Sequence, residues 1–239
     1  MFFIRQKKII LDCFTCDKSV FDYAQIDYAN NFYPKWLKSI DKNYEDGLKI
    51  TSTIKKCEGL LQTYQHGFII PLWCDLAINV ENKNYNWQFA DFKTEVEVHS
   101  SKQWDNFADP TKQGHMKIIS PWQIKTKDEI YFNYTAPYWN LNLDDNFSIP
   151  SGIVNYKYQY GTNINLFINL SKNRKINLEF GTPIAHVIPL SEKNIELKHH
   201  LISYFEWQSI SAKFKFNNQY NTKKRLDQNK EKLKCPFHK

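Results

Sequence analysis

Hydrophobic and polar residues alternate along the middle of the chain. From Gly67 onward, short apolar runs with a two-residue period follow one another, with turn residues between them. The runs are GFIIPLWCDLAINV, YNWQFADF, TEVEVHS, HMKIISPWQI and EIYFNYTAPYW. Closely spaced strands of this kind are typical of a β-sandwich or barrel. The pattern therefore predicts one β domain over residues 67–190.

The clearest alternation lies in residues 149–190. Ile164, Leu166, Ile168 and Leu170 fall on one face of a predicted strand, and asparagines and Phe167 fall on the other. A shift of one residue in strand register would expose all four apolar side chains. We therefore expect these four residues to point into the core.

The regions before and after the predicted β domain have different patterns of apolar residues. Residues 1–66 predict a small α/β region that begins with the strand KKIILDCFT. Over residues 192–207, Ile195, Leu201, Ile202 and Phe205 have a spacing compatible with a helix. The sequence thus predicts a mainly β protein, either a sandwich or a dUTPase-like β-clip, with a helix at 191–211 packed on the β domain and a tail at 212–239.

The tail carries the net charge of the protein. The whole chain has a formal charge of +7, and residues 212–239 hold nine Lys and Arg against Asp227 and Glu231. Clustered cations attract phosphates and release counterions on binding. Weak binding of a polyanion is therefore predicted for Lys223, Lys224, Arg225, Lys230, Lys232 and Lys234. The alternative is a solvated helix, because opposite charges recur at helical spacing.

Composition limits the cellular compartments in which the protein is expected. No run approaches the ~18 apolar residues that span a bilayer, and five cysteines in 239 residues are few for a disulfide scaffold. The expectation is a soluble protein without a membrane partner, located in the cytoplasm, or in a virion if a phage encodes it.

Short Cys and His spacings provide one candidate metal site. Cys13 and Cys16 form a CxxC pair, and Cys235 and His238 form a CxxH pair. Together they would be a Cys3His zinc set that joins the two ends of the chain. The alternative is that Cys13 points into the core from a strand. No other cofactor is predicted.

Catalytic motifs of the common nucleophilic and phosphate-binding classes are missing from the sequence. Asp75 lies inside an apolar run, so we expect it to be partly buried with a hydrogen-bonding or cationic partner. Five tryptophans are spread over the predicted β domain and would form a carbohydrate, nucleobase or protein contact site if several shared an exposed face.

Four segments, in order, resemble the motifs of trimeric dUTPases. They are CDL at Cys74, SPW at Ser120, GIVNYKYQYG at Gly152 and GTPIAH at Gly181. The resemblance implies a β-clip fold over about residues 67–190 and a nucleoside-facing role for Tyr158. Asn155 stands where the family has its water-orienting carboxylate, and an amide is no general base. We therefore expect the triphosphate chemistry to be absent.

Five segments are similar to a bacteriophage and bacterial protein family without an established activity. They are LDCFT, TIKKCEGL, GFIIPLWCDL, HMKIISPWQIK and GTPIAHVIPLSE. The resemblance implies a phage or phage-like origin.

Two functional hypotheses follow. The first is a binding or assembly module on a β scaffold without dUTPase activity, with a protein partner or a second copy as its ligand. The alternative is an enzyme acting on a nucleotide or small molecule in a cleft near Asp75, Ser120, Asn155 and Tyr158. Convergence of these four residues in one pocket favours the enzyme, and dispersal favours the binding module.

Overall fold

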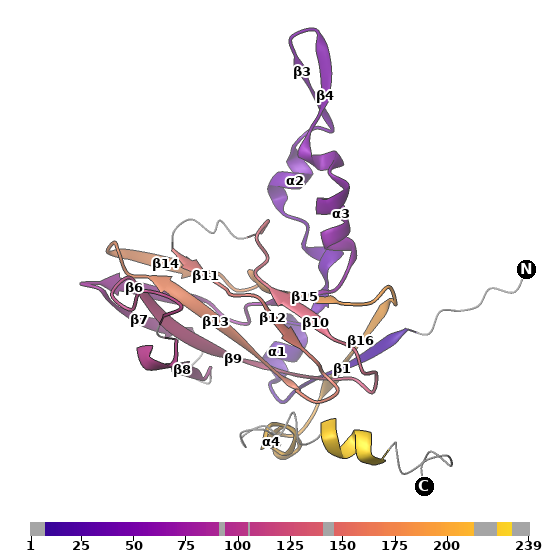
Figure 1. Cartoon of the computed structure of the whole chain (residues 1–239), viewed down its shortest axis with the longest axis vertical. Coiled ribbons are helices and arrows are strands. Elements are labelled where there is room, and N and C mark those ends of the chain that lie inside the picture. The colour runs from indigo at the N-terminus through magenta and orange to yellow at the C-terminus, as the bar shows by residue number, and fades with distance from the viewer. Residues whose placement is uncertain (1–7, 91–93, 105, 141–145, 213–223, 231–239) are drawn as a thin grey trace, which may run out of the picture.

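The computed structural model describes residues 8–90, 94–104, 106–140, 146–212 and 224–230. Strands predominate over helices, so the predicted mainly β class is confirmed. Figure 1 shows a body of packed sheets from which one arm projects. Among the described residues, no helix has the length and apolar character needed to cross a bilayer.

The largest sheet is built around the long strand β9. Its order is β11 (Phe147–Ser148), β13 (Gly161–Asn169), β9 (Gln113–Lys125), β1 (Ile9–Thr15) and β16 (Ile195–Leu201), and β8 (Val96–Val98) also pairs with β9. The β1–β16 pair is parallel and the others are antiparallel. A short 3-10 turn, η3 (Ser101–Gln103), follows β8.

Two further sheets complete the body. One has the order β12 (Gly152–Val154), β10 (Phe132–Thr135), β15 (Pro183–Pro189), β5 (Phe68–Pro71) and β2 (Asp27–Tyr28). The other has the order β14 (Arg174–Leu178), β6 (Leu76–Glu81) and β7 (Asn84–Phe89). Buried side chains from all three sheets form one hydrophobic core, with Trp122 and Tyr156 among the largest.

Strand β13 has the predicted orientation. Ile164, Leu166 and Ile168 are fully buried, and Leu170, just beyond the strand, is also buried. Alternation predicts this strand well because one face of β13 packs against the core along its whole length.

The first strand lies inside the largest sheet, between β9 and β16. The sequence predicts a separate α/β region over residues 1–66, whereas β1 pairs with β9 and β16, and β2 pairs with β5. Helix α1 (Lys18–Tyr23) follows β1, and the Asp17 side chain caps its N-terminus. Residues 9–28 are therefore part of the β body.

The helix predicted over residues 192–207 is wrong in its first half. Residues 195–201 form β16, and α4 (Tyr204–Ala212) begins only after it. Apolar residues at 195, 197 and 201 fit a two-residue period as well as a helical one, and β1 offers an unpaired edge. Ser203 and Glu206 form a capping box, with reciprocal bonds of 3.0 and 3.2 Å, which sets the start of α4.

Residues 33–66 form the projection, which we call the arm. It contains α2 (Lys35–Ser39), the hairpin of β3 (Asn43–Asp46) and β4 (Lys49–Ser52), η2 (Ile54–Lys56) and α3 (Glu58–Gln65). The turn η1 (Ala29–Phe32) leads into it. The hairpin lies at the far end of the arm, away from the sheets (Figure 1).

Candidate functional site

The arm has a small hydrophobic core of its own. Leu37 of α2 and Leu60 and Tyr64 of α3 are buried together, with Tyr33 and Ile40 packed against them. Their spacing places Leu60 and Tyr64 one helical turn apart on the same face of α3. The two short helices therefore support each other outside the main core.

Hydrogen bonds tie the base of the arm to the body. The Tyr64 hydroxyl donates to Asn140 Oδ1 at 2.6 Å, and Asn140 Nδ2 donates to the Phe32 carbonyl at 2.7 Å. Trp36 Nε1 donates to the Trp139 carbonyl at 2.8 Å, and the two indole rings lie 6.0 Å apart. The direction of the arm is thus fixed by contacts with the loop that follows β10.

The hairpin is also fastened to the helices below it. Lys55 Nζ donates to the carbonyls of Lys38 and Ile40, at 3.0 and 2.7 Å, where α2 ends. Lys56 Nζ donates to Asn43 Oδ1 at 2.7 Å at the start of β3. These bonds orient the hairpin along the arm.

The tip of the arm exposes apolar side chains. The loop between β3 and β4 is Gly47-Leu48, and Gly47 has φ 62°, a conformation that glycine adopts without strain. Leu48 is fully exposed, and Ile50 and Tyr44 are 77% and 50% exposed. Neither outer edge of the hairpin pairs with another strand in the described part of the chain. Asp46-Gly47 is a readable hairpin signal in the sequence, with the glycine at the first position of the two-residue loop.

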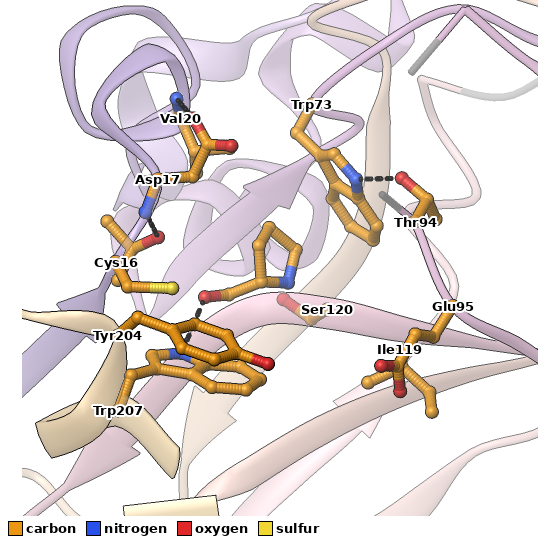
Figure 2. Close-up of a pocket in the computed structure, with 12 residues that line it drawn as sticks. Cys16, Asp17, Val20, Trp73, Thr94, Glu95, Ile119, Ser120, Tyr204 and Trp207 are labelled. Atoms are coloured by element: carbon orange, nitrogen blue, oxygen red, sulfur yellow. Dashed lines mark hydrogen bonds between the residues drawn. The ribbon is translucent and has the colours of Figure 1, made fainter. Parts of the chain in front are cut away.

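A pocket of about 380 Å³ lies at the other side of the body, where α4 meets β9. Five separate segments line it, contributing Thr15, Cys16, Asp17, Val20, Trp73, Thr94, Glu95, Ile119, Ser120, Pro121, Tyr204 and Trp207. Figure 2 shows Tyr204 and Trp207 along one side and Trp73 with Thr94 on the opposite side.

Hydrogen bonds fix the aromatic walls of this pocket. Trp73 Nε1 donates to Thr94 Oγ1 at 2.9 Å, and Trp207 Nε1 donates to the Pro121 carbonyl at 3.2 Å (Figure 2). Tyr204 and Trp207 are three residues apart in α4 and so lie on one helix face. The pocket exists because α4 is held over β9 by the Trp207 indole.

Of the four residues predicted to share a cleft, only Ser120 lines this pocket. The predicted partial burial of Asp75 is wrong, because this residue, which immediately precedes β6, is exposed. The predicted hydrogen-bonding partner is confirmed: Asp75 Oδ1 accepts from the Phe180 amide at 2.6 Å. This carboxylate joins two loops of the body.

Asn155 and Tyr158 lie in a turn after β12. Asn155 is buried, and its Oδ1 accepts from the Lys157 amide at 3.0 Å. The Tyr158 hydroxyl donates to Glu129 Oε2 at 3.3 Å, and burial raises the pKa of Tyr158. Asn155 thus stabilises the turn itself, and Tyr158 joins the turn to the segment that precedes β10.

The candidate zinc ligands fall partly outside the described residues, which do not include Cys235 and His238. Cys13 is fully buried in β1, where burial raises the pKa of its thiol and so disfavours the thiolate that zinc needs. Cys16 lines the pocket. No group of three or more metal-binding side chains occurs within the described ranges. The zinc site stays a prediction.

The tail has one described segment, the helical residues 224–230. Lys224 Nζ lies 3.7 Å from Glu129 Oε1 and donates to the Tyr131 hydroxyl at 2.7 Å. Arg225 and Lys230 are exposed. The other predicted polyanion-binding residues, which lie outside the described ranges, are Lys223, Lys232 and Lys234.

The five tryptophans of the predicted β domain do not share an exposed face, because Trp139 alone among them is exposed. Trp122 is fully buried and Trp73 nearly so, whereas Trp139 is exposed beside Trp36 at the base of the arm. Trp36 lies outside the predicted β domain, so only the folded structure brings it to Trp139.

No protein-family model matches the chain, and no curated protein sequence matches it. The resemblances to dUTPases and to a bacteriophage family stay predictions.

Proposed function

We propose that the protein is a binding or assembly module that attaches to another protein chain through the tip of its arm. The observation that carries the proposal is the exposure of Leu48 and Ile50 at the end of an arm held in a fixed direction. Apolar side chains on a protruding element are typical of protein contact sites, where they are buried on binding.

The form of the hairpin supports the same proposal. A two-stranded hairpin is marginally stable in water by itself, and its unpaired edges offer main-chain groups to a further strand. A partner that adds a strand to β3 or β4 would satisfy these groups and cover the Ile50 side chain. The helices below the hairpin supply the rigidity that lowers the entropic cost of such binding.

The rival enzyme hypothesis has less support. Ser120 lines the pocket beside α4, whereas Asp75, Asn155 and Tyr158 make structural hydrogen bonds elsewhere. An enzyme would need these four residues in one pocket, so their dispersal favours the binding module. The buried amide at position 155 also supports the absence of dUTPase chemistry, since it accepts no proton from water.

Site-specific photocrosslinking tests the proposal. The photoreactive residue p-benzoylphenylalanine replaces Leu48, and the matched control places it at Phe107, which is exposed on the body. We expect irradiation of cells to give a discrete adduct at position 48, identified by mass spectrometry as a second copy or as another protein. The adduct should weaken when Ile50→Ser is added. The same adducts at both positions, or none at position 48, would refute a role for the tip.

A further inference from the structure

A second pocket, of about 170 Å³, is lined by β12 and the start of β13, together with Tyr134 of β10. Its lining residues belong to continuous described ranges. Carboxamide side chains are frequent among them, at Gln159, Asn163 and Asn165. No described lining residue is a Lys, Arg, His, Asp or Glu. The described lining therefore offers hydrogen bonds without formal charge.

Gly152 leaves open space at this pocket. It pairs with Tyr134 across the β10–β12 ladder, and a Cβ added to Gly152 would meet nothing within 4 Å. A glycine inside a strand often marks the close approach of a ligand. The volume of about 170 Å³ is similar to the ~150 Å³ that accommodates one six-membered ring. The pocket thus has room for a single ring.

Strand β13 presents two of the carboxamides on one face. Asn163 and Asn165 are two residues apart, which places them about 7 Å from each other on the same side of the strand. Asn165 Oδ1 accepts from His115 Nε2 at 3.1 Å, so its Nδ2 group is left to donate. The Asn163 side chain makes no hydrogen bond within the described ranges. Lys117, opposite Asn165 in β9, is paired with Glu97 at 2.5 Å.

The turn before β13 adds the third carboxamide. The Gln159 amide donates to the Asn155 carbonyl at 2.8 Å, which fixes the main chain at this point. The Gln159 side chain is exposed and has no hydrogen bond to the rest of the described chain. Ser151 Oγ lies 3.0 Å from Thr135 Oγ1, and a hydroxyl with one such bond can still bond a ligand. Donors and acceptors are therefore both offered around the open space.

The pocket has little aromatic surface for stacking. Tyr134 is only 8% exposed, and burial raises its pKa well above its ordinary value, so the phenol stays neutral. Nucleobases without a stacking platform lose much of their binding energy. Recognition here must rest on hydrogen bonds in several directions, which favours a ligand whose own groups both donate and accept.

We propose that this pocket binds a neutral sugar ring, in a free saccharide or in a glycan. Each sugar hydroxyl both donates and accepts, as a carboxamide does, so Gln159, Asn163 and Asn165 can each pair with ring hydroxyls. The ring would lie over Gly152, where no side chain occupies the space. The site is separate from the arm and does not depend on the proposed function.

Ligand-observed NMR titration of the full chain tests the ligand class. The probes are the methyl glycosides of glucose, galactose, mannose and N-acetylglucosamine, with the amino sugars and uronic acids that correspond to them. We expect saturable binding of at least one neutral glycoside and about fivefold weaker binding of its charged counterparts, because the described lining has no charge to pair with them. No binding of any neutral glycoside, or tighter binding of uridine, would overturn the proposal.

A disaccharide of the preferred sugar distinguishes the two sources. Binding about tenfold tighter than that of the methyl glycoside assigns the site to a glycan whose second unit also contacts the protein. Equal binding assigns it to a single sugar unit, as the volume for one ring suggests.

Matched variants locate the binding. Gly152→Val fills the open space with a side chain that strands favour, and we expect it to weaken binding about tenfold. Asn163→Ala removes one carboxamide and should weaken binding about threefold. Asn177→Ala, at an exposed position of β14 outside the pocket, is the control and should leave binding unchanged. Thermal unfolding checks that each variant is folded. Equal effects of the two alanine variants, or full binding by folded Gly152→Val protein, would refute the assignment to this pocket.

Discussion

The Tyr64 hydroxyl of α3 donates a hydrogen bond of 2.6 Å to the side chain of Asn140, which lies 76 residues further along the chain. Tyr64 is buried, its ring lies 4.8 Å from that of Tyr33, and Asn140 holds the Phe32 carbonyl as well. One tyrosine therefore joins the core of the arm to the body.

Tyr64→Phe should loosen the arm. The variant removes the donor and leaves the half-buried Asn140 oxygen without it, which costs about 0.5–1.5 kcal/mol. We expect faster hydrogen exchange at arm amides and unchanged exchange in the sheets. Tyr33→Phe is the matched control, because no hydrogen bond of the Tyr33 hydroxyl occurs within the described ranges. Equal effects of the two variants would show that the hydroxyl bond does not hold the arm.

Gly67→Ala should destabilise the protein by about 2 kcal/mol or more. Gly67 connects the arm to β5 with φ 79°, and an added Cβ would lie 2.1 Å from the Val187 carbonyl oxygen of β15. Gly59→Ala is the control, since a Cβ there meets nothing within 4 Å. Because Gly59 is the second residue of α3, Gly59→Ala should leave stability unchanged or raise it by up to about 0.5 kcal/mol. Urea unfolding measures both changes, and a neutral Gly67→Ala would contradict the tight contact.

Acidification should destabilise the fold through His186. Its ring is buried beside Tyr64, with Nε2 bonded to the His66 carbonyl at 3.0 Å, and burial lowers its pKa. Below about pH 6.5 the unfolded chain binds a proton that the folded chain does not, so stability falls as the pH drops. Above that pH the histidine is neutral in both states and has no such effect.

Urea unfolding between pH 8 and pH 5 measures this dependence. His186→Gln should flatten the slope, whereas His66→Gln should preserve it, because the carbonyl that His186 uses belongs to the main chain. His115 and His199, whose pKa values burial also lowers, contribute in the same direction. A slope that survives His186→Gln in full would assign the effect to these two.

Removal of the residues after Ala212 should abolish retention on a phosphate-bearing column. The tail carries charge equal to that of the entire chain, and salt should weaken its binding steeply by counterion release. Lys224 contacts Glu129 and Tyr131, so Lys224→Gln should reduce retention less than the combined change of Arg225 and Lys230 to Gln. Unchanged retention of the truncated protein would place any polyanion site on the body.

The success and failure of sequence-based prediction have local physical reasons. Strand β13 was predictable because its alternation needs no knowledge of its neighbours. Strand β16 was not predictable, because the spacing of its apolar residues fits both a helix and a strand. Pairing with the edge of β1 is what favours the strand. The capping box at Ser203 was a readable signal for the start of α4.

The candidate sites were harder to predict from the sequence than the strands. The pocket draws its lining from five segments between Thr15 and Trp207, and Ser120 is the predicted site residue among them. No spacing in the sequence brings these segments together. The hairpin follows from Asp46-Gly47, but its projection depends on bonds between the arm and residues 139–140, which only tertiary structure provides.

The parallel pairing of β1 with β16 has a consequence for how the protein is made. Ile9 pairs with Ile195, so β1 leaves the ribosome long before the strand with which it pairs has been synthesised. Contacts so distant in sequence slow folding, since a long loop must close before any pairing energy is gained. During synthesis the edge of β1 stays open to other chains. We expect the largest sheet to stay incomplete until β16 has been synthesised, with β16 as the strand that closes it.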